Sequence, residues 1–146
     1  MKKGLLVGMT VFLISLSAIV MASDNGNMLS KEEGAAHQFM EGLSSDTVQV
    51  SKLQSIMAPQ IAAKVNDKWI VATQQALKNK FGTQKEIKFA SYQRANQGDF
   101  VIYIASYEKA PVVRIVFQFD GKDDVQIQSF AYSIVNKPTA PVPATK

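Results

Sequence analysis

The chain has 146 residues, a formal net charge of +4, a single histidine and no cysteine. Without cysteine it can have no disulfide, thiolate nucleophile, cysteine-based zinc site or lipid-modified cysteine. Two of the positive charges, Lys2 and Lys3, lie at the extreme N-terminus. The rest of the chain is therefore nearly neutral and lacks the strong basic excess of a general nucleic-acid binder, so we predict no nucleic-acid partner.

Residues 1–22 have the pattern of a bacterial secretory signal, with two lysines, an uncharged apolar run and small residues at the end. Val20 and Ala22 fit the positions before a cleavage site, which would make Ser23 the new N-terminus. The uncharged run also approaches the roughly 18–20 residues that a membrane-spanning helix needs, so a retained anchor stays open. We predict a periplasmic or secreted protein that contacts a membrane only if this segment is uncleaved.

The next segment predicts a polar linker over residues 23–29 and then a helix. Ser30 to Glu33 reads as a capping box, in which the serine and the glutamate bind each other's free backbone amides. Apolar residues then recur at helical spacing: Ala35, Ala36, Phe39, Met40 and Leu43. We expect the helix to end near Ser44 or Ser45.

Three further helices are expected before the strands. Residues 53–57 and 59–65 predict two short helices, because Pro59 interrupts the pattern and suits the first turn of a new helix. The stretch from Asn66 to Phe81 predicts a longer helix with an N-terminal cap, an apolar side that contains Trp69, and a stop at Gly82.

The pattern then changes to the alternation typical of strands. Residues 85–94, 100–108, 112–119 and 125–135 predict four strands with short turns between them, hence an antiparallel meander. Residues 137–146 contain three prolines and no apolar pattern, which predicts a disordered tail. The fold class is therefore α+β: a single domain over residues 30–136, with N-terminal helices packed on a curved four-stranded antiparallel sheet.

This order of elements resembles a known fold. A Trp-bearing helix that ends in Phe-Gly before the first strand is similar to the cone-shaped fold of nuclear transport factor 2 and ketosteroid isomerase. The stretches that carry the resemblance are FMEGL, WIVATQQALKNKFG and VFQFDGKDDVQIQSFAYSIV. More narrowly, the chain resembles small exported bacterial domains of unknown function with that fold, and a cystatin-like wrap of sheet around helix is the neighbouring alternative.

The sequence contains no recognisable catalytic or metal-binding constellation. His37 stands off the apolar stripe of its helix, and one imidazole without cysteine or paired carboxylates does not make a zinc site. The aspartates from Asp120 to Asp124 read as a polar turn. Isomerase chemistry of the resembling family would need a buried aspartate, and we expect the aspartates to lie in caps and turns. We therefore predict no catalytic residue, no metal and no cofactor.

Five residues are candidates for ligand binding, because amphipathic side chains orient ligands in mostly apolar sites: Trp69, Tyr103, Tyr107, Arg114 and Tyr132. The resemblance implies a pocket between the sheet and the long helix. Trp69 could equally be a core residue, and the tyrosines could lie at the sheet margin. The basic stretch from Lys64 to Arg94 could face an anionic surface or simply be solvated.

The leading hypothesis is an exported, non-enzymatic binding or interaction module of the bacterial cell envelope. Its partner would be a small apolar ligand or an envelope protein, with a possible homodimer through the sheet face. Two alternatives stay open: a small pocket enzyme of isomerase or dehydratase type, which needs a perturbed buried carboxylate, and a membrane-anchored subunit of an envelope (secretion) assembly.

Overall fold

A computed structural model describes residues 22–136 of the chain. The predicted signal over residues 1–22, except its last residue Ala22, and the predicted tail over residues 137–146 lie outside the described residues. Within the described range, helices come first and strands follow: α1 (Ala22–Ser44), α2 (Val50–Ser55), α3 (Pro59–Ala62), α4 (Asp67–Phe81), β1 (Gln84–Ala95), β2 (Gly98–Tyr107), β3 (Val113–Phe119) and β4 (Ile127–Ile134). No helix among these is both long and apolar enough to cross a membrane.

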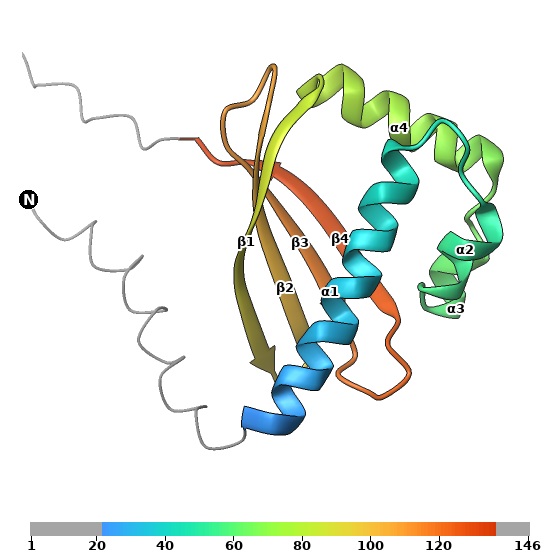
Figure 1. Cartoon of the computed structure of the whole chain (residues 1–146). Coiled ribbons are helices and arrows are strands. Elements are labelled where there is room, and N and C mark those ends of the chain that lie inside the picture. The colour runs from blue at the N-terminus through green and yellow to red at the C-terminus, as the bar shows by residue number, and fades with distance from the viewer. Residues whose placement is uncertain (1–21, 137–146) are drawn as a thin grey trace, which may run out of the picture.

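The strands form an open antiparallel sheet in the order β1-β2-β3-β4, which confirms the predicted α+β meander. Figure 1 shows α1 crossing one face of this sheet, with α4 at one end of it. Successive side chains of a strand point to opposite faces. The helix-facing positions of β2 and β3 are accordingly buried, whereas their neighbours are more exposed.

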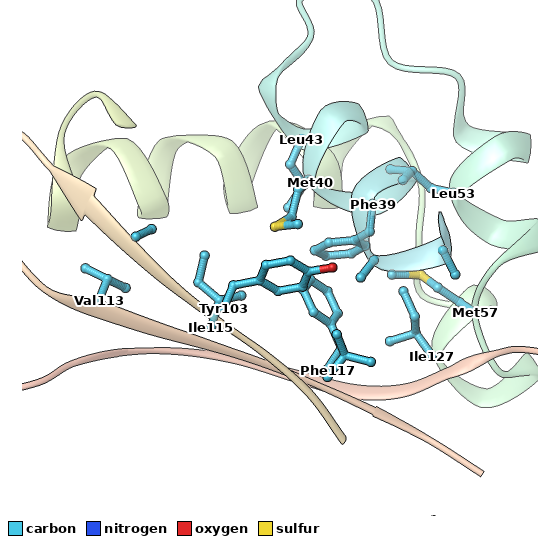
Figure 2. Packing of buried hydrophobic residues seen from close by; sticks show 14 of the residues in the cluster. Phe39, Met40, Leu43, Leu53, Met57, Tyr103, Val113, Ile115, Phe117 and Ile127 are labelled. Carbon is cyan, nitrogen blue, oxygen red and sulfur yellow. The ribbon is translucent and has the colours of Figure 1, made fainter. Parts of the chain in front are cut away.

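The hydrophobic core lies between α1 and the sheet (Figure 2). The ring of Phe39 from α1 lies 5.5 Å from that of Phe117 on β3 and 4.5 Å from that of Phe130 on β4. Aromatic pairs at these separations stabilise a core beyond the area that they bury. The stripe that predicted the helix is thus the surface that binds it to the sheet.

α1 begins well before Ser30, which corrects the predicted capping box. The helix starts at Ala22, so Ser30 and Glu33 are inside it and the residues expected to form a linker belong to it. The physical reason is that the core-facing stripe continues toward the N-terminus. Leu29 packs partly against the core and Glu32 is buried, one helical turn before Ala36. Packing therefore continues the helix past the residues that look like a start signal.

α4 has the ends that its sequence predicts. The side chain of Asn66 accepts a hydrogen bond of 2.9 Å from the backbone N–H of Trp69, which caps the first turn. Gly82 ends the helix at φ +77°, a conformation that favours glycine. Trp69 packs partly against the core, with its ring edge-on to Phe130 at 6.2 Å. The helix is thereby fixed at both ends and along its inner side.

Candidate functional site

The structure separates the five candidate binding residues. Tyr107 and Tyr132 lie together on the helix-facing side of the sheet, where both line one groove. Tyr103 is buried in the core. Trp69 on α4 packs against the core and does not line the groove. Arg114 is exposed on the opposite face of β3. Two of the five candidates are therefore brought to a common surface.

The groove is a depression of about 420 Å³ between the end of α1, the middle of α4 and the sheet. Its apolar surface comes from Met40, Leu43, Leu77 and the rings of Tyr107 and Tyr132. Its polar surface comes from Ser44, Asp46, Gln74, Gln75, Lys78 and the Gly82–Gln84 segment. An apolar surface with a few polar groups beside it is the usual composition of a small-molecule site.

Hydrogen bonds fix the walls of the groove. The Gln74 amide on α4 donates to the carbonyl oxygens of Leu43 and Ser45, each at 3.1 Å, and so ties α4 to the end of α1. At the other end, Lys109 N–H donates to the carbonyl of Phe81 at 2.9 Å. A side chain at Gly82 would meet Glu108, with its Cβ only 2.9 Å from the Cβ of that residue. Close packing at Gly82 therefore joins α4 to the end of β2.

The two tyrosines of the groove are held by Phe81. Its buried ring lies 5.4 Å from that of Tyr107 and 6.3 Å from that of Tyr132. The Tyr107 hydroxyl donates to the Gln84 side chain at 3.1 Å. Burial raises the pKa of both tyrosines above the ordinary value. Both therefore stay neutral near pH 7 and offer hydroxyl groups rather than charge.

Tyr103 has a different environment. Its hydroxyl is fully enclosed and has no hydrogen-bond partner among the described residues. In Figure 2 this oxygen, drawn in red, points toward Phe39 inside the core. Burial raises the pKa of Tyr103 to about 12, with a smaller contribution from the charge of Glu33. An enclosed hydroxyl without a partner costs stability, because it has lost its hydrogen bonds to water.

We expect Tyr103→Phe to raise the free energy of unfolding by about 1 kcal/mol, because it removes that unpaired hydroxyl and keeps the ring. Urea unfolding followed by the fluorescence of Trp69 measures this change. Tyr107→Phe is the matched control, since it breaks the hydrogen bond to Gln84 and should lower stability by about 1 kcal/mol. A loss of stability in Tyr103→Phe would contradict the prediction and indicate a bound water at the hydroxyl.

A second cluster corrects the expectation that no aspartate is buried on a strand. Asp99 lies on the helix-facing side of β2 and is only 1% exposed. Its carboxylate accepts a hydrogen bond of 2.8 Å from the Tyr92 hydroxyl. The guanidinium of Arg94, its cross-strand neighbour, donates to both carboxylate oxygens at 3.1 Å. These partners satisfy a carboxylate that the sheet takes out of water.

Glu32 on α1 is completely buried, and Asp99, Arg94 and Tyr92 of this cluster all act on its carboxyl group. Neither of its carboxyl oxygens has a hydrogen-bond donor placed to bind it in the described part of the chain. Burial, and then the negative charge of Asp99, raise the pKa of Glu32 from 4.5 to about 7, while Arg94 and the nearby Tyr92 hydroxyl oppose the shift. The chain thus contains a carboxyl group that changes charge near neutral pH.

The carboxyl cluster is enclosed in the part of the chain that the structure describes. The described residues contain no group of three or more histidine, aspartate or glutamate side chains placed to hold a metal. Glu32 and Asp99 are both enclosed, and neither lines the groove. Two patterns in the sequence point to the pair. Glu32 continues the apolar stripe of α1 at the spacing of Ala36 and Phe39, and Asp99 alternates with Val101 on β2.

The comparisons with known proteins found no match. No protein-family model matches the chain, and neither a curated protein nor a solved structure was found that resembles it.

Proposed function

We propose that the chain is an exported, non-enzymatic binding module of the cell envelope that holds a small amphipathic ligand in the groove between α1, α4 and the sheet. The observation that carries this proposal is the groove itself, with Tyr107 and Tyr132 in its apolar surface and Lys78 and Asp46 among its polar residues. A ligand with an apolar body and one charged end would match both surfaces.

The architecture supports the same proposal. Helices packed on one face of an open antiparallel sheet are compatible with the cone-shaped fold that the sequence resembles. In that fold the helices and the sheet enclose a ligand pocket, and we propose that the groove between α4 and the strands serves as its counterpart. The hydrogen bond from Gln74 and the close packing at Gly82 hold the walls of the groove before any ligand binds. This lowers the entropic cost of binding.

Binding can be tested with 8-anilinonaphthalene-1-sulfonate, a fluorescent probe with an apolar body and one anionic group. We expect wild-type protein to bind the probe saturably, and Ser44→Trp to weaken binding at least about tenfold by placing an indole in the groove. Ser51→Trp on the exposed side of α2 is the matched control, because Ser51 does not line the groove. Equal binding by both variants would exclude the groove as the ligand site.

The location of the protein and the cleavage of its signal can be tested separately, on protein purified gently from its own cell envelope. Native mass spectrometry should give the mass of a chain that begins at Ser23, together with the mass of a small co-purifying molecule. A mass that retains Met1 would favour the anchored subunit of an envelope assembly instead.

The pocket-enzyme alternative has one supporting observation, the raised pKa of Glu32. Turnover would require a substrate to reach Glu32, which is enclosed and distinct from the residues of the groove. The carboxyl pair is therefore better explained by a role within the protein itself.

A further inference from the structure

Two carboxyl groups are enclosed together between α1 and the β1–β2 hairpin. Glu32 is completely buried and Asp99 is 1% exposed. Asp99 already accepts hydrogen bonds from Tyr92 and Arg94, so its negative charge is compensated on the hairpin side. The backbone at Gly121 closes another side, since a Cβ at that position would lie 3.3 Å from a carboxylate oxygen of Asp99. Glu32 approaches Asp99 from α1, close enough for the charge of Asp99 to act on it.

Glu32 has no donor of its own in this arrangement. Two ionised carboxylates that share an enclosed site repel each other, and a single proton between them removes the repulsion and supplies the missing donor. The described partners of Asp99 fit this division. They are all hydrogen-bond donors, which leaves Glu32 as the group that carries the shared proton.

Apart from Glu32, the part of α1 around this residue has few contacts that hold it on the core. In the N-terminal half of α1, defined here as residues 26–34, Leu29 is the described apolar residue that packs on the core, and it is only partly buried. Gly26 and Gly34 each lower helix stability by about 1 kcal/mol relative to alanine. The fully buried stretch of the stripe begins only at Ala35 and Ala36. Glu32 is therefore the main buried contact of this half-helix.

We propose that Glu32 and Asp99 share one proton and form a pH-sensitive latch that holds the N-terminal half of α1 on the β1–β2 hairpin. When the pair is singly protonated, the half-helix is held. When the proton leaves, two enclosed negative charges face each other and the half-helix detaches more readily, so that Glu32 reaches water.

The other polar and charged groups near the pair compensate a second negative charge only in part. On β1, the hydroxyl of Tyr92 and the guanidinium of Arg94 both bind Asp99, and both also lower the pKa of Glu32, although burial and Asp99 outweigh them. In the β3–β4 turn, Asp120 pairs with Lys122 at 3.7 Å. On α1 itself, Lys31 is exposed on the outer side, and the charge of Glu33 acts on Tyr103. A deprotonated Glu32 therefore has only the guanidinium of Arg94, which it shares with Asp99, as a cation among these groups.

Hydrogen exchange of the full chain, measured by mass spectrometry on a peptide covering residues 27–36, tests the latch. Opening moves Glu32 from an environment with a pKa of about 7 to water, where it is about 4.5. Opening therefore releases one proton between these values, and its equilibrium constant should rise up to about tenfold per pH unit from pH 5 to 7, then level off. Rates are corrected for the intrinsic pH dependence of amide exchange.

Glu32→Gln keeps the shape and supplies a permanent amide donor to Asp99, so its protection should not change over this range. Glu41→Gln, an exposed position of the same helix, should behave as wild type. Carboxyl ¹³C NMR provides a second readout, in which Glu32 should titrate near pH 7. The latch is excluded if Glu32 titrates near 4.5, or if wild type and Glu32→Gln lose protection in parallel.

Discussion

Replacing Gly98 with alanine should lower the free energy of unfolding by at least about 3 kcal/mol. Gly98 begins β2 with φ at +123°, a backbone conformation that a residue with a side chain rarely adopts. An added Cβ would also overlap the carbonyl oxygen of Phe119 on β3, which is backbone and cannot rotate away. Strain and overlap therefore act together at one position, and urea unfolding followed by Trp69 fluorescence measures the loss.

Gly34→Ala is the matched control. Gly34 lies inside α1, is exposed, and has no atom within 4 Å of an added Cβ. Alanine is the better helix former, so this variant should gain about 0.5–1 kcal/mol. A Gly98→Ala variant as stable as wild type would mean that the β1–β2 hairpin adopts a different turn. Because Asp99 is the next residue, such a turn would also alter the position of the carboxyl pair.

Local signals account for much of the fold that the sequence predicts. Asn66 and Gly82 bound α4 because capping and the left-handed stop depend on a few neighbouring residues. The strands follow from alternation and short turns, which also set their order in an antiparallel meander. The capping-box prediction at Ser30 failed because the same local pattern can occur inside a helix that packing extends.

The sites depend on contacts that no local pattern defines. Tyr107 and Tyr132 line one groove because β2 and β4 both face the helices and Phe81 lies against both rings. Glu32 meets Asp99 only because α1 crosses the sheet at that level. The sequence places each carboxylate on an inward-facing position, but the crossing point follows from tertiary packing. The sequence could therefore show that Glu32 is a polar residue within an apolar stripe. It could not show that Asp99 is the residue that Glu32 meets.

Wild-type stability should decrease as the pH rises from about 4.5 to 7, and Glu32→Gln should remove that decrease. The pKa of Glu32 is about 7 in the folded protein and has the ordinary value of 4.5 in the unfolded chain. Between these values the folded state binds more protons, so the stability contributed by the protonated group is lost as the pH rises. The shift corresponds to at most about 3 kcal/mol. Urea unfolding at pH 4.5, 6 and 8 measures the change.

At pH 8 the Glu32→Gln variant should therefore be about 2–3 kcal/mol more stable than wild type, and at pH 4.5 the two should be similar. Asp99→Asn separates repulsion from simple burial. It removes the second charge that acts on Glu32, but weakens the hydrogen bonds from Tyr92 and Arg94. It should lower stability at pH 4.5 and also reduce the decrease toward pH 8. If the loss of stability toward pH 8 stays as large as in wild type, the charge of Asp99 contributes nothing to the pKa of Glu32. Burial alone would then raise that pKa.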